Sequence, residues 1–320
     1  MKNVLKVDPH APQRDAITRA AKILQGGGLV AFPTETVYGL GAHALNSQAV
    51  RKIFIAKERP DWDPLIVHVR DLHMARPLMK RLSAQFEMLT SRFWPGALTL
   101  VVEKAEQVPG EVTAHRPTVA LRMPWHPVAA ALLAAANLPV AAPSANRFGR
   151  PSATRAKHVA DDLGDRVDLI LDAGPTPIGV ESTVLDLTRS PPAILRPGGV
   201  TREELANVLG DVTIARGVEK ESAAVGRAAP GMALKHYAPS ARVELFDSPD
   251  ELEARANELR EGRQRVGKIR DVRADTLFTR LRALDAAGAE VILCLLPPRE
   301  GIGLALRDRL LRAAGKGGEQ

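Results

Sequence analysis

Short runs of apolar residues alternate, up to about residue 215, with segments in which apolar residues recur every three or four positions. The first run, at 28–32, ends at Pro33, and 47–56 then shows the helical spacing. An unbroken apolar run is typical of a buried strand, and a period near 3.6 is typical of an amphipathic helix. Further strands are predicted at 65–69, 97–102, 119–123, 167–171, 183–187 and 193–195, and helices near 80–92, 126–137 and 152–162.

Several of these strands follow one another too closely for a helix to fit between them. Parallel neighbours need a crossover of about a dozen residues or more, whereas antiparallel neighbours need only a turn. The pattern therefore predicts an α/β fold with a mixed sheet. Helix starts are marked too: Ser47 and Ser152 are expected to cap their helices, and Thr201-Arg-Glu-Glu204 is a capping box for a helix that ends at Gly210.

The pattern changes at 216–240, which is rich in Gly, Pro, Ala and Ser and has neither period. Strands return at 242–246 and 291–296, with helices after Ser248, at 277–287 and at 302–313. A chain of 320 residues also exceeds one ordinary domain. The sequence predicts a first domain at 1–215, an interdomain linker at 216–240 and a small αβ domain at 241–320.

Composition narrows the class of protein. Apolar residues make up 45% and charged residues 25%, which excludes disordered, collagen-like and coiled-coil chains. A net charge of +7 favours a polyanionic partner, which could be nucleic acid, acidic lipid or a phosphorylated small molecule. The single Cys294 allows neither an internal disulfide nor a cysteine zinc site, and the longest apolar stretch, 127–143, is short for a membrane span. We expect a soluble, cytoplasmic protein.

Common catalytic motifs are missing from the sequence. It has no Walker A motif, no dinucleotide fingerprint after a strand, no HExxH and no GxSxG. Aromatic residues make up only 4%, which disfavours recognition of RNA by base stacking. What remains is a set of small hydroxyl and basic residues just beyond predicted strand ends, a place where α/β proteins bind ligands.

Five such segments are present, and we expect them to form one cleft. Lys and Arg held together suit phosphates, because Arg binds oxygens bidentately and Lys supplies a point charge. The charge surplus gathers in the same places: 51–60 carries four Lys and Arg against one Glu, and 141–160 carries four against no carboxylate. The sequence therefore predicts a polyphosphate site. The five segments are 33–40, 57–60, 142–146, 179–184 and 195–199.

The residues in these segments also form an ordered set of motifs. Between Gly27 and Gly199 the chain reads PTETVYGLG, the KxR of Lys57 and Arg59, PLIVHV, LRMP, the SxN of Ser144 and Asn146, ESTV and LRPG. This set strongly resembles the threonylcarbamoyl-AMP synthase family. The stretch PGMALKHYAPSA at 230–241 resembles the linker of that family's long, two-domain form. The resemblance covers nearly the whole chain.

The resemblance implies a fold and an activity. The fold is an open, twisted mixed sheet with helices (YrdC-like), followed by a small Rossmann-like αβα domain. The activity is the synthesis of threonylcarbamoyl-AMP and diphosphate from L-threonine, bicarbonate and ATP, with Mg²⁺ accompanying ATP. The product serves the t6A modification of tRNA, so the implied partners are the threonylcarbamoyl-transferase proteins of that pathway, with weak direct tRNA contact left open.

The resemblance also assigns residues, position by position. It places Thr36, His68, Arg122, Ala142 and Ser182 around threonine. It places Arg59, Asp63, Thr118, Ser144, Asn146, Ser152, Arg196 and Tyr237 around ATP, and makes Lys57 and Arg59 the catalytic cations. Asp63 departs from the family, which usually has Asn there, and a carboxylate at this place would bind the ribose or need Mg²⁺.

This chemistry is consistent with the absence of a serine or metal hydrolase motif. A carbamate already carries a nucleophilic oxygen, so the site needs positioning and charge stabilisation more than a strong base. Two alternatives stay open. The basic cleft could hold an RNA backbone, or the chain could make another carbamoyl-adenylate, as does the hydrogenase-maturation carbamoyltransferase, which usually carries zinc-finger cysteines.

Overall fold

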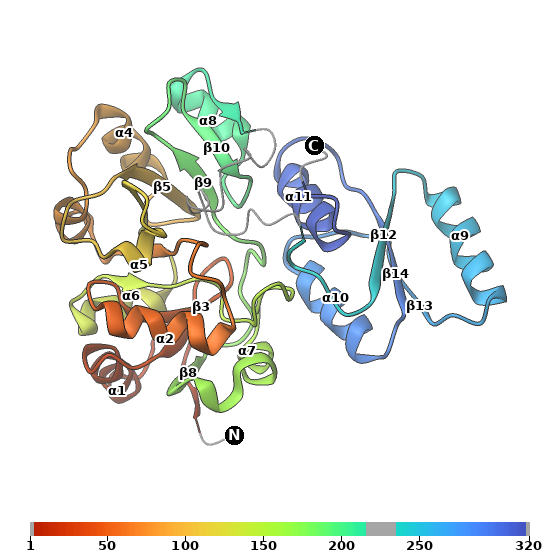
Figure 1. Cartoon of the computed structure of the whole chain (residues 1–320), viewed down its shortest axis with the longest axis horizontal. Helices are drawn as coiled ribbons and strands as arrows, with labels where there is room; N and C mark the ends of the chain where they lie inside the picture. The colour runs from red at the N-terminus through yellow and green to blue at the C-terminus, as the bar shows by residue number, and fades with distance from the viewer. Residues whose placement is uncertain (1–2, 216–234, 318–320) are drawn as a thin grey trace.

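The computed structural model describes residues 3–215 and 235–317, which form a larger and a smaller α/β domain lying side by side (Figure 1). The 216–234 part of the predicted linker lies outside the described residues. In the part of the chain that the structure describes, no helix has the length and apolar character needed to cross a membrane.

The larger domain is built on one eleven-stranded sheet. Pairings such as β2 with β3 are antiparallel and others such as β4 with β6 are parallel, so the predicted mixed sheet is confirmed. From edge to edge its strands are β1 Val4–Lys6, β8 Leu169–Asp172, β2 Val30–Pro33, β3 Tyr38–His43, β7 Val140–Ala141, β4 Ile66–His68, β6 Thr118–Arg122, β5 Leu98–Glu103, β9 Thr183–Asp186, β10 Ala193–Arg196 and β11 Thr213–Ile214.

Helices cover both faces of this sheet. Val30 and Phe32 of β2 pack with α1 and α6 on one face, while Ala31 faces the core under α2, α4 and α7. This alternation follows from the two-residue period of a strand. The helices are α1 Arg14–Gln25, α2 Ser47–Lys57, α3 Leu72–Ala75, α4 Ala84–Phe93, α5 Gly110–Thr113, α6 Pro127–Ala136, α7 Ala156–Leu163 and α8 Arg202–Leu209, with 3₁₀ turns at Arg76–Leu78 and Gly164–Arg166.

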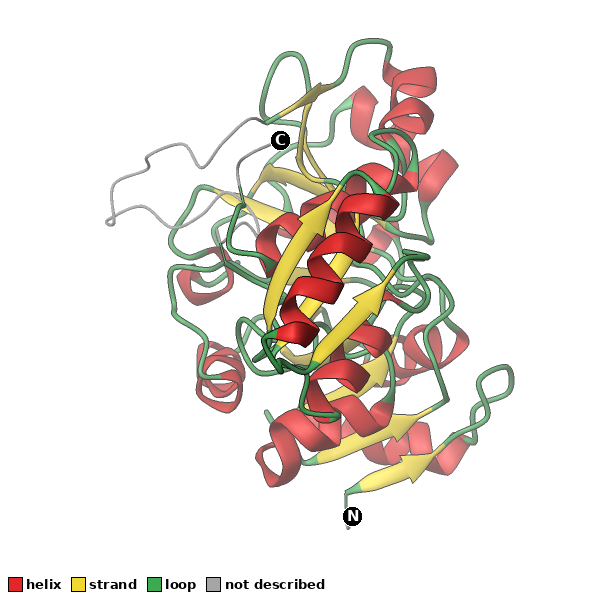
Figure 2. Cartoon of the chain, turned by 90° about the vertical axis from the view of Figure 1, so that its right-hand side faces the viewer, coloured by secondary structure: helices red, strands yellow, loops and turns green. Residues whose placement is uncertain are grey.

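The smaller domain is a three-layer αβα unit, as predicted. Its parallel sheet has the order β12 Arg242–Phe246, β14 Val291–Leu295, β13 Val266–Ile269. Helix α9, Pro249–Glu261, packs on one face, and Figure 2 shows it in front of these strands, running along them. Helices α10, Leu277–Ala286, and α11, Ile302–Ala313, pack on the other face. Val291 and Leu293 of β14 face α9, whereas Ile292 and Cys294 face α10 and α11.

Two predicted helix caps are wrong and one is confirmed. Asn46, not Ser47, caps α2, because its side chain accepts from the N–H groups of Gln48 and Ala49. Helix α7 begins at Ala156 with Arg155 as its cap, so Ser152 lies outside the helix. Thr201 and Glu204 form the predicted capping box of α8, which stops at Gly210.

Candidate active site

One cavity lies where the loops at the strand ends of the larger domain meet residues 236–237. It encloses about 40 Å³, room for a few water molecules. Nine of the residues assigned above to threonine or ATP line it together, although they come from distant parts of the chain. They are Thr36, His68, Arg122, Ala142 and Ser182 from the threonine set and Arg59, Ser144, Arg196 and Tyr237 from the ATP set.

Arg122, at the end of β6, is held in place by a carboxylate that the sequence analysis did not single out. Its Nη2 lies 2.6 Å from Oε1 of Glu35, and its Nε donates to the carbonyl of Gly96 at 3.2 Å. The other oxygen of Glu35 accepts from the backbone N–H of Trp125 at 2.9 Å. Both side chains are buried, so Arg122 presents its guanidinium to the cavity in a fixed direction. A fixed guanidinium is suited to a carboxylate ligand.

His68 lies beside Arg122 on the neighbouring strand β4. Burial, together with the positive charge of Arg122, lowers the pKa of His68 to about 3. The imidazole is therefore neutral near pH 7. Its ring meets Phe32 edge-on, and among the described residues its Nδ1 has no hydrogen-bond partner. A neutral ring nitrogen on a cavity wall can hydrogen-bond to a bound molecule.

Ser182 and Arg196 are joined across the cavity wall. The hydroxyl of Ser182 lies 2.7 Å from that of Thr99 on β5, and its carbonyl accepts from Nη2 of Arg196 at 2.9 Å. Arg196 is buried at the end of β10. These contacts bring a serine of the threonine set and an arginine of the ATP set to the same place.

Arg59 is oriented by Asp63. Nη2 of Arg59 lies 3.0 Å from Oδ2 of Asp63, and both side chains are nearly inaccessible to solvent. The guanidinium also donates to the carbonyls of Asp63 and Pro64 and lies over the ring of Phe148. The carboxylate that the sequence analysis assigned to the ribose or to Mg²⁺ is thus paired with an arginine of the cavity wall.

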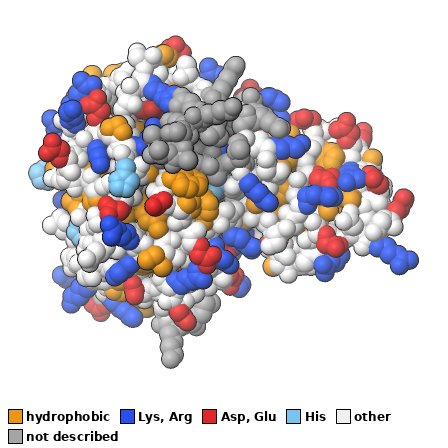
Figure 3. Space-filling model, in the orientation of Figure 1, with side chains coloured by type: hydrophobic (Ala, Val, Ile, Leu, Met, Phe, Trp, Pro, Cys, Tyr) orange, Lys and Arg blue, Asp and Glu red, His pale blue; other side chains and the backbone are white. Residues whose placement is uncertain are grey.

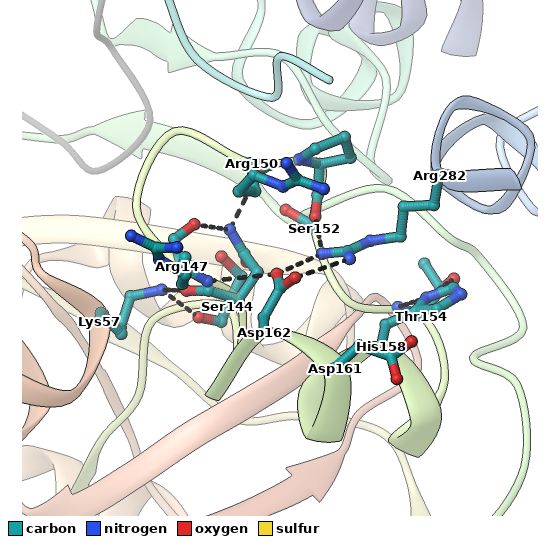
Figure 4. Close-up of polar contacts among 12 residues, drawn as sticks. Lys57, Ser144, Arg147, Arg150, Ser152, Thr154, His158, Asp161, Asp162 and Arg282 are labelled. Carbon is teal, nitrogen blue, oxygen red and sulfur yellow. Dashed lines mark hydrogen bonds and ion pairs between the residues drawn. The ribbon is translucent and has the colours of Figure 1, made fainter. Parts of the chain in front are cut away.

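Lys57 lies behind the wall rather than on it. Its ammonium donates to the carbonyl of Ser144 at 2.6 Å (Figure 4). It also donates to the carbonyl of Asn146. Burial, and then the charge of Arg59, lowers the pKa of Lys57 well below its ordinary value. The side chain of Asn146 in turn donates to the carbonyls of Arg147 and Arg150. Lys57 and Asn146 therefore fix the shape of the SxN loop.

Four members of the predicted ATP set lie off the cavity wall: Asp63, Asn146, Ser152 and Thr118. The hydroxyl of Ser152 donates to Oε1 of Glu181, which does line the cavity, so Ser152 acts on the wall through Glu181. Thr118 begins β6, four residues before Arg122, which corresponds to about 13 Å along a strand. The structure therefore does not bring Thr118 together with the other residues in this cavity.

His236 and Tyr237 close the cavity from the side of the smaller domain. The Tyr237 ring stacks on Phe278 of α10 with centroids 5.5 Å apart, and its backbone has a φ of 58°, a left-handed conformation that is costly for a residue other than Gly, Asn or Asp. The backbone N–H of Ala238 donates to the carbonyl of Gly149 at 2.7 Å. Tyr237 is therefore held against both domains.

Comparison with known proteins identifies the family. Residues 22–198 match a family model described as "Telomere recombination", and residues 200–315 match one described as "Threonylcarbamoyl-AMP synthase, C-terminal domain". A threonylcarbamoyl-AMP synthase of Pyrococcus abyssi is 44% identical over 92% of this chain and 93% of its own length. The chain belongs to the threonylcarbamoyl-AMP synthase family. A Bacillus subtilis synthase is 42% identical over 93% of each chain.

The fold agrees with that family. The crystal structure of P. abyssi Sua5 complexed with L-threonine superposes with a TM-score of 0.92 at 42% identity and covers 98% of both chains. The match extends over both domains, which confirms the prediction of the two-domain form of the threonylcarbamoyl-AMP synthase family.

Sequence reasoning missed several residues of the site. Glu35 and Glu181 stand inside the quoted PTET and ESTV motifs, so the signal was present but was assigned to their hydroxyl neighbours. Thr34, Pro143 and His236 line the cavity as well. Arg309, which contacts Glu181 from α11, has no local motif, because a buried arginine on an amphipathic helix resembles any surface arginine in sequence.

Proposed function

We propose that this protein makes threonylcarbamoyl-AMP and diphosphate from L-threonine, bicarbonate and ATP. The observation that best supports this proposal is the Arg122–Glu35 pair, which aims a guanidinium into the same small cavity that Arg59 and Arg196 line. A carboxylate ligand would bind Arg122, and phosphates would bind Arg59 and Arg196. The two reactants are thereby brought together, which is a large part of catalysis in a two-substrate reaction.

The residues have separate tasks in this mechanism. Arg122 holds the threonine carboxylate, and the hydroxyl of Ser182 donates a hydrogen bond to the same molecule. The threonine amine and bicarbonate give a carbamate and water. A carbamate oxygen then forms a bond to the α-phosphorus, the bond between that phosphorus and the bridging oxygen breaks, and diphosphate leaves. Arg59 and Arg196 stabilise the charge that builds up on the phosphate oxygens.

Lys57 contributes to this mechanism through the loop it holds. Its ammonium donates to the carbonyls of Ser144 and Asn146, and these two hydrogen bonds fix the shape of the SxN loop. We therefore assign it a positioning role behind the phosphates. Tyr237, on the wall formed by residues 236–237, would cover the bound nucleotide. Because the cavity is small, we expect this wall to shift when ATP enters.

Mg²⁺ belongs to the proposal as a companion of ATP. No group of three or more His, Cys, Asp or Glu suited to a metal exists among the described residues, and Glu181 is the carboxylate on the cavity wall. Both oxygens of Glu181 already accept from Ser152 and Arg309, so Mg²⁺ would be held mainly by the phosphates and by water, as is common for this ion. The ion would neutralise triphosphate charge.

The remaining expectations also belong to the proposal. The product would pass to the threonylcarbamoyl-transferase proteins of t6A synthesis in the cytoplasm. On the face shown in Figure 3 basic and acidic side chains are interspersed, so this face does not support direct tRNA contact. Phosphate-backbone binding calls for a continuous basic surface.

The experiment that tests the proposal is diphosphate release with each substrate omitted in turn. We expect release to require ATP, L-threonine and bicarbonate together, and we expect serine to substitute poorly. Release that continues without threonine would contradict the proposal. Salt-dependent tRNA binding with no ATP consumption would favour the RNA-binding alternative instead, and turnover with carbamoyl phosphate in place of bicarbonate would favour another carbamoyl-adenylate enzyme.

A further inference from the structure

Arg309 of α11 is a fully buried arginine that reaches from the smaller domain to the wall of the cavity. Its Nε lies 2.8 Å from Oε2 of Glu181, and its Nη2 donates to the carbonyl of Pro197 at 2.9 Å. Its guanidinium carbon lies 5.1 Å from the centre of the Tyr237 ring. The side chain has 0% exposure, so it does not line the cavity itself. It supports residues on the cavity wall and a residue next to that wall.

Each of these three contacts leads to a residue assigned to ATP. Glu181 accepts a hydrogen bond from the hydroxyl of Ser152, Pro197 directly follows Arg196, and Tyr237 is a member of the set. The threonine end of the cavity, at Arg122 and Glu35, is held by other contacts. The smaller domain therefore acts on the nucleotide end of the site.

The charges around Arg309 explain why a cation is needed here. Burial alone would raise the pKa of Glu181, but Arg309 and Arg196 outweigh it and hold the pKa below its ordinary value. Glu181 is therefore an anion on the wall of a cavity that is to receive a triphosphate. The negative charges of Glu181 and of a triphosphate in the same cavity would repel each other strongly, because both are shielded from water. Arg309, which also pairs with the buried Asp308, supplies positive charge beside this carboxylate and fixes its orientation.

We propose that Arg309 is a positioning residue of the active site, through which the smaller domain sets the orientation and the charge of Glu181 and thereby the affinity for ATP. This inference rests on the proposed function, since it concerns the ATP end of the same site. It assigns the smaller domain a part in substrate binding.

A second set of contacts keeps the two domains together independently of Arg309. Arg282 of α10 pairs with Asp162 of α7 at 2.6 Å, with both side chains mostly buried, and donates to the carbonyl of Pro151 (Figure 4). Arg150 pairs with Asp285 of α10 at 3.1 Å. A substitution at Arg309 should therefore leave the domains in contact.

The experiment compares Arg309→Gln with Arg307→Gln in the full-length protein. Arg307 is a matched control because it is a buried arginine on the same helix, yet its partners, Asp247 and the carbonyl of Pro297, lie within the smaller domain. For Arg309→Gln we expect the KM for ATP to rise at least tenfold and the KM for threonine to stay within twofold. For Arg307→Gln we expect both KM values to stay within twofold.

Two further variants separate positioning from folding. Arg309→Lys keeps the charge, and it should recover part of the ATP affinity. Arg309→Gln combined with Glu181→Gln removes the carboxylate that Arg309 neutralises, so it should bind ATP better than Arg309→Gln alone. Because the double variant no longer leaves a buried carboxylate unpaired, it should regain stability as well, so the ATP affinities are compared per folded molecule. Thermal unfolding of each variant reports the folded fraction to which the rates are normalised.

The outcomes distinguish this inference from the proposed function. The positioning role would be overturned if Arg309→Gln had the wild-type KM for ATP, or if Arg309→Gln and Arg307→Gln raised that KM equally. Threonine-dependent turnover of the wild-type protein would still support the proposed function. If the wild-type protein shows no threonine-dependent turnover, the proposed function fails, and calorimetric ATP binding to the same variants still tests Arg309. Unchanged ATP binding would then overturn the inference.

Discussion

The ammonium of Lys57 donates a 2.6 Å hydrogen bond to the carbonyl of Ser144 and a second hydrogen bond to the carbonyl of Asn146. A lysine at the last position of α2 thus serves as a scaffold for a loop that is distant in sequence. The loop in turn contributes Ser144 to the cavity wall. A role of the KxR lysine in catalysis would therefore act through the geometry of this backbone loop.

Replacing Lys57 by methionine should affect both stability and ATP use. The variant leaves the carbonyls of Ser144 and Asn146 without this donor, at about 1–3 kcal/mol for the buried one, that of Asn146. We therefore expect a lower unfolding temperature and a rise of tenfold or more in the KM for ATP, measured by differential scanning calorimetry and diphosphate release. Lys52, which donates to the carbonyl of Gly27 from the same helix, supplies the control Lys52→Met. Equal ATP kinetics in the two variants would contradict the scaffold role.

Glu35 should govern threonine affinity and leave ATP affinity largely intact. Glu35→Gln weakens a buried, charge-assisted contact to Arg122, and such contacts contribute about 1.5–3 kcal/mol. We expect threonine to bind roughly ten to a hundred times more weakly, by calorimetry in the absence of ATP. A comparable loss of ATP affinity would show that Glu35 supports the whole cavity rather than its threonine end.

Asp63 allows a test of what its carboxylate does. If it only orients Arg59, Asp63→Asn should keep an accepting oxygen for the guanidinium and preserve diphosphate release within about threefold. Asp63→Ala should lower the unfolding free energy by about 3 kcal/mol or more, because it breaks a buried ion pair. The Mg²⁺ concentration that gives half-maximal activity should be the same in Asp63→Asn and the wild type. A large increase in that concentration would instead identify Asp63 as a metal ligand.

His68 should make the fold sensitive to acid. Its pKa of about 3 in the folded protein lies below the ordinary value of 6.5, so the unfolded chain binds a proton that the folded chain does not. Stability from this residue is therefore complete above pH 6.5 and is lost as the pH falls toward 3. Between pH 7 and pH 5 the loss should be about 2 kcal/mol.

Denaturant unfolding at the two pH values measures this contribution. His68→Gln should lose about 2 kcal/mol less than the wild type over the same interval. If His68→Gln and the wild type show the same pH dependence, the buried neutral imidazole is not the cause of the acid sensitivity.

The sequence predicted the parts of the fold that depend on local pattern. The capping box at Thr201 and the buried strands were predictable, because hydrophobic period and cap chemistry act over a few residues. Strand β3, at Tyr38–His43, was not predicted. It begins inside the PTETVYGL motif, which was interpreted as a loop. The cap of α2 was misplaced by one residue because Asn46 and Ser47 are both good caps, and Ser47 instead donates to Glu111.

The residues that line the cavity were predictable only to the extent that their motifs are local. The residues that line the cavity came from strand ends, where the sequence marks them with hydroxyl and basic side chains. The partners that orient them are long-range: Glu35 lies 87 residues from Arg122, and Glu181 lies 128 residues from Arg309. Such pairings depend on how the sheet and the smaller domain assemble, which hydrophobic period does not encode.

The most direct test of the proposed function is to identify the product by mass spectrometry after incubation with ATP, L-threonine and ¹³C-labelled bicarbonate. The account predicts one adenylate that contains AMP, threonine and the labelled carbon, formed in step with diphosphate release. Diphosphate released without a labelled adduct of threonine and AMP would contradict it.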